Sequence, residues 1–222
     1  MSYQDRGPQS CIAYNIISSG SKGNAVILED IIMVECGVSF KAIKPYIGGL
    51  RLVLLTHEHQ DHFRESTIRR LASERPTLRF GCGAWLVNDL IQCGISKHLI
   101  DVYTMDTFNQ YSRFGIETFQ LYHNVPNCGY KIHIDGRRAL YATDTCKMTT
   151  TAQGYDLYMI EANYTEASLQ DRLTRKLEEG AEYINELVVP DNHLSEEAAM
   201  EWLAKNMGDD SKYVLMHMHE ER

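Results

Sequence analysis

The stretch LVLLTHEHQDH, residues 52–62, joins an apolar run directly to three histidines and two acidic residues. A short run of branched and apolar residues predicts a β-strand that is covered on both faces. The polar residues then fall on the loop at the carboxyl end of that strand, where side chains can converge from a rigid sheet. Histidine is the commonest nitrogen ligand of zinc, and aspartate supplies an oxygen ligand. The stretch therefore predicts a metal centre at the end of a buried strand.

The spacing of these polar residues suits two metal ions. His57 and His59 share one direction if the chain stays extended, because alternate residues of a strand lie on the same side. Asp61 and His62 turn away into the start of the next helix. The alternative is a polar loop that is rich in histidine by chance, in a chain that has 9 His among 222 residues. The residues downstream decide between these interpretations.

Strands alternate with helices in the first half of the chain, and strands dominate its middle. The patterns predict strands at 52–55, 78–82, 100–105 and 213–216, and helices at 62–74, 84–93, 165–179 and 195–207. Asp135-Gly136 predicts a hairpin turn, and Ser195 followed by two acids predicts a capped helix start. No linker or repeat divides the chain. We expect one α/β domain over residues 1–222, built as a four-layer αββα sandwich.

Composition limits the partners. Lys and Arg number 22 against 30 Asp and Glu, which gives a net charge of −8 and argues against a broad basic face, although a local basic funnel is compatible with it. The first residues lack the order of a signal peptide, and no stretch approaches the roughly 18 apolar residues of a membrane span. We expect a cytoplasmic protein that does not bind membranes. Its 6 scattered cysteines form no Cys-x-x-Cys pair and are expected to be reduced thiols.

The pattern His-x-His-x-Asp-His after an apolar strand resembles the signature of the metallo-β-lactamase superfamily. In that family a lone His, an Asp and a final His follow in order, each at the end of an apolar run, and this sequence offers His123, Asp144 and His217. The resemblance implies one metal held by His57, His59 and His123, a second held by Asp61, His62 and His217, and Asp144 bridging the two. The expected cofactors are two divalent ions, Zn²⁺ by the nitrogen-rich donor set, with Mn²⁺ as the alternative.

Some of these positions have other interpretations. His123 is also compatible with an ordinary strand end, and Asp144 with a turn former. His217 and His219 lie two residues apart and face the same way on a strand, so either imidazole could be the last ligand; we favour His217. Glu35 stands where the family usually has Asp, which changes the hydrogen bonding expected beside the metals.

The resemblance also limits the branch of the superfamily. Asp144 occupies the position where class B β-lactamases carry Cys, and His59 the position where diiron flavoproteins carry Glu. Phe63-Arg64 replaces the small residues of glyoxalase II relatives, and only 21 positions separate His123 from Asp144, too few for the inserted domain of β-CASP nucleases. These four branches are therefore disfavoured.

The later part of the chain favours phosphodiesters. Glu161-Ala162-Asn163 and His193-Leu194-Ser195 resemble paired segments of ribonuclease Z and, more closely, of the single-domain DNA exonuclease-like branch. In these relatives the Glu and the His pair beside the metals, so the resemblance makes Asp61, His193 and Glu161 the catalytic candidates, with His193 protonating the leaving oxygen. A capped helix start is the alternative interpretation of the second segment. No arm that grips transfer RNA is recognised.

The sequence thus predicts a dinuclear metal hydrolase, a phosphodiesterase or nuclease that acts on nucleic acid through a metal-activated water. One alternative is a phosphodiesterase for small cyclic nucleotides of the phage anti-defence type. Another is a metal-binding partner protein without catalysis. The expected partners are nucleic acid or a small nucleotide, and relatives of this kind often form homodimers. Arg64, Arg69, Arg70, Arg137 and Arg138 are candidates for phosphate contacts, although charges on helices and turns usually form a solvated face.

Overall fold

Strand β4 (Leu52–Leu55) lies near the middle of a sheet, and all its side chains are fully buried. Val53 and Leu55 pack toward helices, whereas Leu52 and Leu54 pack toward a second sheet. The strand is thus covered on both faces, as its composition predicts. The computed structural model describes residues 11–181 and 183–218. His219, the alternative last ligand, lies outside the described residues.

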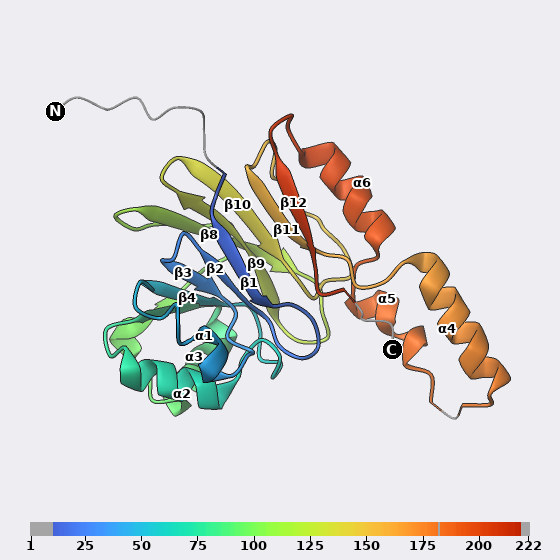
Figure 1. Ribbon diagram of the computed structural model, residues 1–222, viewed down its shortest axis with the longest axis horizontal. Coiled ribbons are helices and arrows are strands. Elements are labelled where there is room, and N and C mark those ends of the chain that lie inside the picture. Colours follow the sequence, from blue (N-terminus) through green and yellow to red (C-terminus); the bar gives the residue numbers. More distant parts are fainter. Residues whose placement is uncertain (1–10, 182, 219–222) are drawn as a thin grey trace.

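The first sheet has the strand order β1-β2-β3-β4-β5-β6 (Figure 1). Its first two pairings are antiparallel, and β3 to β6 run parallel. The strands are β1 (Tyr14–Ser18), β2 (Ala25–Leu28), β3 (Ile32–Val34), β4, β5 (Arg79–Cys82) and β6 (Ile100–Val102). The second sheet has the order β12-β11-β10-β9-β8-β7. Its strands are β7 (Phe108–Gln110), β8 (Phe114–Leu121), β9 (Asn127–Ile134), β10 (Arg137–Ala142), β11 (Leu157–Glu161) and β12 (Lys212–Met216), of which β10, β11 and β12 run parallel.

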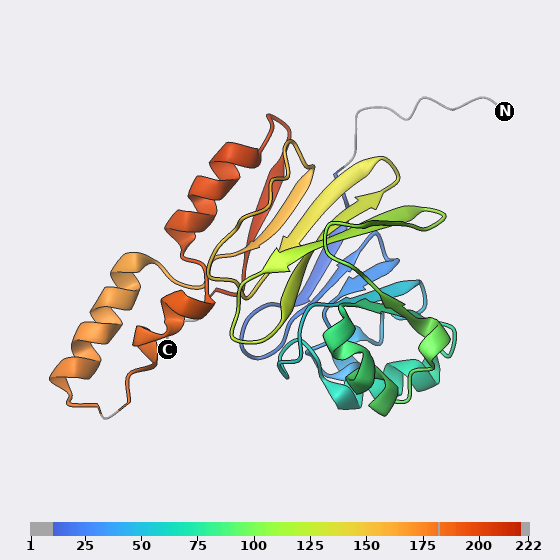
Figure 2. The same ribbon diagram turned by 180° about the vertical axis from the view of Figure 1, so that it is seen from behind.

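Helices cover the outer faces of both sheets (Figures 1 and 2). The first sheet is covered by α1 (Phe40–Ile43), α2 (Glu65–Glu74) and α3 (Val87–Gln92), the last preceded by the 3₁₀ turn η1 (Ala84–Leu86); a second turn, η2 (Lys97–Leu99), leads into β6. The second sheet is covered by α6 (Glu196–Asn206), whose Ala199 and Leu203 pack on Tyr158 and Ile160 of β11. Three apolar cores separate the four layers, so the expected αββα sandwich is confirmed.

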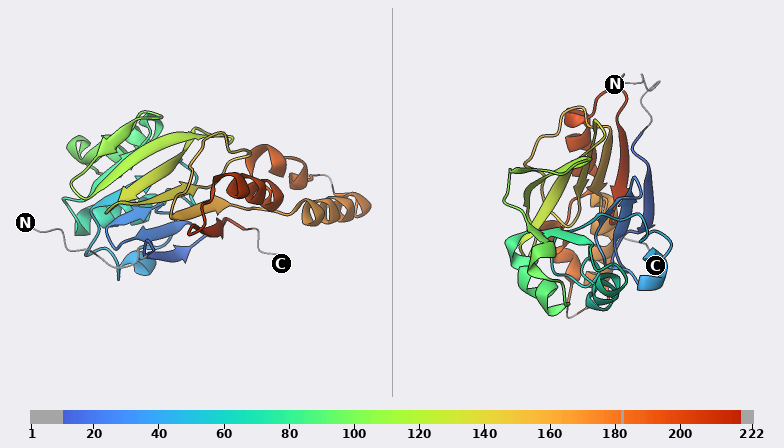
Figure 3. Two further views of the ribbon diagram at one scale, coloured as in Figure 1. Left: turned by 90° about the horizontal axis from the view of Figure 1, so that it is seen from above. Right: turned by 90° about the vertical axis from the view of Figure 1, so that its left-hand side faces the viewer.

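One helical segment leaves the sandwich. Helix α4 (Glu166–Glu178) has no fully buried residue and projects beyond the sheets (Figure 3). The chain returns through the turn η3 (Asn185–Leu187) and the short helix α5 (Val189–Asn192). Among the residues that the structure describes, no helix combines the length and the apolar character that crossing a membrane requires.

Several predicted boundaries shift in the structure. Helix α2 begins at Glu65 and not at His62, because residues 60–62 form a turn, and the amides of His62 and Phe63 both donate to the His59 carbonyl, at 2.9 and 2.7 Å. The strand predicted at 100–105 ends at Val102. The hairpin at Asp135-Gly136 is confirmed, with φ of +49° and +80°, as a type I′ turn requires.

Gly37 allows two segments of the site to approach each other. Its amide donates to the Asn24 carbonyl at 2.9 Å, and the amide of Cys36 donates to the His62 carbonyl at 2.9 Å. A Cβ atom added at Gly37 would lie 1.7 Å from the carbonyl oxygen of Asp61, which is backbone and cannot rotate away. The loop that carries the histidines is therefore held in place by a residue without a side chain.

We predict that Gly37→Ala lowers the free energy of unfolding by about 1–3 kcal/mol through overpacking. The melting temperature would fall by about 2–4 °C for each kcal/mol in a chain of this size. Gly48→Ala is the matched control, since nothing lies within 4 Å of a Cβ at that position. Equal melting temperatures of the two variants in thermal denaturation would contradict this packing.

Candidate metal centre and its surroundings

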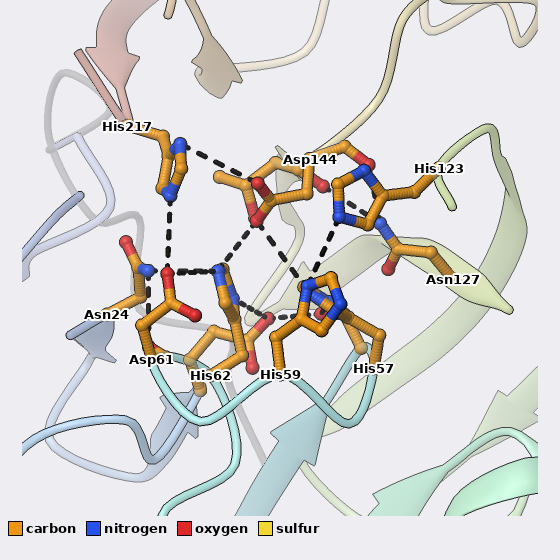
Figure 4. A network of polar contacts seen from close by, with 12 residues as sticks. Asn24, His57, His59, Asp61, His62, His123, Asn127, Asp144 and His217 are labelled. Atoms are coloured by element: carbon orange, nitrogen blue, oxygen red, sulfur yellow. Dashed lines mark hydrogen bonds and ion pairs between the residues drawn. The ribbon is translucent and has the colours of Figure 1, made fainter. Parts of the chain in front are cut away.

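The candidate residues lie at the carboxyl ends of strands from both sheets. The loop 56–62 follows β4, His123 follows β8, Asp144 follows β10, and His217 follows β12. In the second sheet β8, β10 and β12 end at the same side, because β8 and β10 both run antiparallel to β9 while β10, β11 and β12 are parallel. Contacts of the loop 56–62 with His123, Asp144 and His217 place the end of β4 beside them. The seven residues that the resemblance implies as ligands therefore converge, although they are spread over 161 positions of the sequence (Figure 4).

Three imidazoles form the first group of potential ligands. His57 Nε2 lies 3.1 Å from His59 Nδ1, which lies 3.2 Å from His123 Nε2. The edge of a tetrahedron around zinc with bonds of about 2.0–2.1 Å is about 3.3–3.4 Å long, which is close to these separations. The arrangement could hold one divalent ion.

The second group joins a carboxylate to two imidazoles. Asp61 Oδ2 lies 3.4 Å from His62 Nε2 and 3.5 Å from His217 Nε2. His217 Nε2 is buried and makes no hydrogen bond with any residue of the described chain. A buried polar atom without a partner is rare unless an ion or a water satisfies it. This group fits a second cation.

Asp144 lies between the two groups. Its Oδ2 atom is 2.6 Å from His62 Nε2 and 4.0 Å from His57 Nε2, so one oxygen faces both groups (Figure 4). Its backbone carbonyl accepts a hydrogen bond of 2.7 Å from Asn127 Nδ2. This is the position of a bridging ligand.

A buried carboxylate orients two of the imidazoles. Thr56 Oγ1 donates to Glu35 Oε1 at 2.6 Å and accepts from His57 Nδ1 at 2.8 Å. His62 Nδ1 lies 3.3 Å from the same Glu35 oxygen. With a metal bound, protons on both Nδ1 atoms would leave both Nε2 atoms as lone-pair donors, which is the usual arrangement around histidine ligands. Glu35 therefore accepts from Thr56 and lies beside His62, at the position where the family usually has the shorter Asp.

His123 is oriented in the same way by a backbone group. Its Nδ1 lies 3.0 Å from the carbonyl oxygen of Asn192 and donates to it, which leaves Nε2 to face His59. Asn192 is the last residue of α5 and directly precedes His193, so α5 holds both imidazoles at this side of the site.

Three residues at the site have a strained backbone. Glu35, Asp144 and His217 have φ of +66°, +57° and +53°, in the left-handed region, where non-glycine residues cost of order 1–3 kcal/mol each. Each follows a strand end and turns its side chain toward the cluster. The amide of Glu35 donates to the Leu54 carbonyl at 2.8 Å, and the amide of His217 donates to Ser19 Oγ at 2.7 Å.

The pKa values of the buried histidines are shifted in two opposite directions. Burial, together with the charge on His62, lowers the pKa of His57 to about 2, and burial also lowers the pKa of His123. Burial opposes the charged form of His217 too, but Asp144, Asp61 and Glu161 raise its pKa to about 10. Burial likewise opposes the charge of His62, whose pKa Asp144 and Glu35 raise well above its usual value. The first group thus offers neutral lone pairs, and the second offers imidazoles beside carboxylates.

Glu161 and His193 form a pair at the side of the cluster. His193 Nδ1 donates to Glu161 Oε1 at 2.7 Å, and Glu161 Oε2 accepts from the amides of Thr145 and Leu194 at 2.8 and 3.3 Å. Glu161 is fully buried, whereas the His193 side chain is 21% exposed. The backbone bonds occupy one oxygen of Glu161, so this residue orients His193 and leaves its Nε2 atom directed away from the carboxylate.

The segment at residues 193–195 both caps a helix and supplies the histidine that pairs with Glu161. Ser195 Oγ accepts from the amide of Ala198 at 3.2 Å and caps α6, while His193 pairs with Glu161. Asp144, Glu161, His193 and His217 also form a group close enough to hold a metal ion. The hydrogen bonds of Glu161 favour an orienting role over ligation.

Sequence reasoning missed three supporting residues. Asn24 accepts from the Gly20 amide at 2.8 Å, donates to the Asp61 carbonyl at 3.2 Å and lies 2.9 Å from His62 Nε2. Asn127 and Thr56 are the others. Thr56 directly precedes the histidine motif, which was the available signal; Asn24, at the end of a polar run, and Asn127 carry none.

Comparisons with known proteins agree with this geometry. A family model described as beta-lactamase superfamily domain matches residues 32–218. The exodeoxyribonuclease WalJ of Streptococcus pneumoniae is 26% identical over an alignment that covers 94% of this chain and 82% of that protein. The metallo-beta-lactamase fold protein YhfI from Bacillus subtilis superposes with a TM-score of 0.70 at 16% identity, covering 94% of this chain and 86% of that one. The short form of human tRNase Z gives 0.67 at 16% identity, covering 93% and 92%.

The chain belongs to the beta-lactamase superfamily, a superfamily of hydrolases, and has the metallo-β-lactamase fold. The resemblance predicted from the motif at residues 57–62 is confirmed. The similarity to an exodeoxyribonuclease is consistent with the nuclease and phosphodiesterase branch of that superfamily.

We predict that Thr56→Val lowers the free energy of unfolding of the chelator-treated protein by about 1–3 kcal/mol, because the buried Glu35 loses a donor and His57 Nδ1 loses an acceptor. Urea denaturation measures the change. Thr107→Val is the control, since that exposed hydroxyl makes only a long contact of 3.4 Å with the Met105 carbonyl. Equal stability of both variants would show that the hydroxyl does not bridge Glu35 and His57.

Proposed function

We propose that this protein is a dinuclear metal-dependent phosphodiesterase that cleaves nucleic acid. The observation that carries the proposal is the position of Asp144 Oδ2, which faces His62 at 2.6 Å and His57 at 4.0 Å and so lies between two complete ligand groups. In this proposal His57, His59 and His123 hold one ion, Asp61, His62 and His217 hold the other, and Asp144 bridges them. The nitrogen-rich donor set suits zinc.

Two divalent ions at such a site lower the pKa of a water molecule and neutralise charge on a phosphate under in-line attack. The chain supplies the rest of the chemistry. Asp61 Oδ2 is the acceptor that can orient the attacking water, since the Asp61 side chain is one-quarter exposed and this oxygen faces His62 and His217. His193, held by Glu161 through Nδ1, presents Nε2 as the proton donor to the leaving oxygen.

The relatives support the choice of substrate. The exodeoxyribonuclease WalJ aligns with nearly the whole chain, and the folds of YhfI and the short human tRNase Z match it. The pair Glu161–His193 suits a leaving group that needs a proton, and the alkoxide oxygen released from a sugar is such a group.

Asp61→Asn tests the metal and water chemistry. We expect it to abolish hydrolysis of both bis-p-nitrophenyl phosphate and single-stranded oligonucleotides, because Asp61 is proposed to hold one ion and to orient the water. Metal content per chain, measured by mass spectrometry of the protein after reconstitution with Zn²⁺ or Mn²⁺, would fall from two toward one. Two metals with no turnover of these substrates or of cyclic nucleotides by the unmodified chain would favour a binding protein, and turnover of cyclic nucleotides alone would favour the small-nucleotide enzyme.

His193→Gln tests the proton donor separately. We expect oligonucleotide hydrolysis to fall by about 10²–10⁴-fold. Hydrolysis of bis-p-nitrophenyl phosphate would fall far less, because p-nitrophenolate leaves without being protonated. His98→Gln is the matched control, since His98 is exposed on η2 at the opposite end of β6 from the site. An equal loss with both substrates would contradict the assignment of His193 as the acid.

A further inference from the structure

A groove of about 990 Å³ lies beside the candidate metal centre, between the loop that follows β1 and the projecting helix α4. One wall is formed by Ser18, Ser19, Gly20, Ser21 and Lys22, the other by Thr165, Ala167, Ser168, Asp171, Arg172, Arg175 and Lys176, with Glu186 and Met218 completing the lining. The sequence predicted the helix at 165–179, but not that it faces residues 18–22 across a groove.

Both sides of the groove are hydrogen-bonded to the backbone of His217 at one end. Ser19 Oγ accepts from the amide of His217 at 2.7 Å. On the other wall, Asn163 Nδ2 donates to the His217 carbonyl at 3.1 Å, two residues before Thr165 caps α4. A helix rises about 1.5 Å per residue, so the side chains at the middle and end of α4 lie roughly 10–15 Å along the groove from that anchor. The groove therefore leads away from His217.

One face of α4 is turned to the groove. The lining residues of this helix are spaced by three and four positions, from Ser168 through Arg172 to Arg175 and Lys176. The lining holds four cations and two acids, in a chain whose net charge is −8. The groove thus concentrates positive charge where the molecule as a whole is negative.

Two arginines on this face are available to a ligand. Glu186 is occupied by Lys176 Nζ at 2.8 Å. Neither Arg172 nor Arg175 is within ion-pair distance of a described carboxylate, although the charge of Arg172 contributes to lowering the pKa of Glu186. By contrast, Arg69 and Arg70 of α2 pair with Glu65 and Glu74. Arginine suits the bidentate recognition of phosphate oxygens.

We propose that this groove binds the sugar-phosphate backbone of a single nucleic-acid strand that extends from the scissile bond. This proposal rests on the proposed function and specifies its substrate as a polymer, not a cyclic nucleotide. The volume of about 990 Å³ is within the range of small-ligand sites and suits a few linked nucleotides. No aromatic side chain lines the groove among the described residues, so it contacts phosphates and sugars and carries no sequence preference.

The test compares two double variants of the full chain. Arg172→Gln with Arg175→Gln removes the groove cations, and Arg51→Gln with Lys97→Gln removes the same charge from exposed positions at the opposite ends of β4 and β6. Binding is measured by fluorescence anisotropy with hydrolysis-resistant phosphorothioate oligonucleotides of about 12 nucleotides, over a range of salt concentrations. Single-stranded DNA, single-stranded RNA and duplex DNA are the three probes.

The groove variant should bind single strands about tenfold more weakly, and its plot of log K against log salt should be shallower by about 0.7 for each phosphate that the protein no longer neutralises. The control variant should match the unmodified chain, and hydrolysis of bis-p-nitrophenyl phosphate should be unchanged in both. Equal affinity and slope in the two variants, or tighter binding of duplex than of single strands, would overturn the groove proposal. If the unmodified chain binds oligonucleotides in the groove but hydrolyses no phosphodiester, the proposed function fails while the groove proposal stands.

Discussion

The contact of Asp144 with His62 and His57 is the interaction on which the rest of the site depends. The carboxylate follows a strand of the second sheet, and the two imidazoles lie in the loop after β4 of the first. This contact therefore joins the two sheets at the carboxyl ends of these strands. Burial alone would raise the pKa of Asp144, but His62 and His217 hold it well below its usual value. The carboxylate therefore stays ionised in a place where an isolated charge would be very unfavourable. Its charge is what makes the site suited to cations.

Strained residues at such a site keep their conformation only because the surrounding structure holds them in place. Glu35, Asp144 and His217 all have left-handed backbones, and each lies where a strand from a rigid sheet has just ended. Hydrogen bonds to Asn127, Ser19 and the Leu54 carbonyl hold these residues from outside the cluster. Strain of this type clusters at functional sites, where it holds ligands ready for their partner. The apolar cores on both sides of each sheet provide the rigidity that this requires.

Much of this could be predicted from the sequence, because the chemistry is concentrated in a short motif. The run from His57 to His62 indicated the family, and the family order then indicated His123, Asp144 and His217. Burial of β4 followed from its composition, and the hairpin followed from Asp135-Gly136. The supporting residues were harder, since Asn127 is one polar residue among many and only the pairing of β9 with β10 places it beside Asp144. Helix α4 was predicted as a helix, but its projection depends on which face finds a partner, and periodicity does not show that.

The most direct test of the dinuclear centre is a crystal structure of the protein grown with Zn²⁺, with anomalous scattering recorded on both sides of the zinc absorption edge. We expect two anomalous peaks per chain, about 3.5–4 Å apart, on either side of the Asp144 carboxylate. One peak would lie among His57, His59 and His123, and the other among Asp61, His62 and His217. A single peak, or a peak held instead by Glu161 and His193, would contradict the proposed centre.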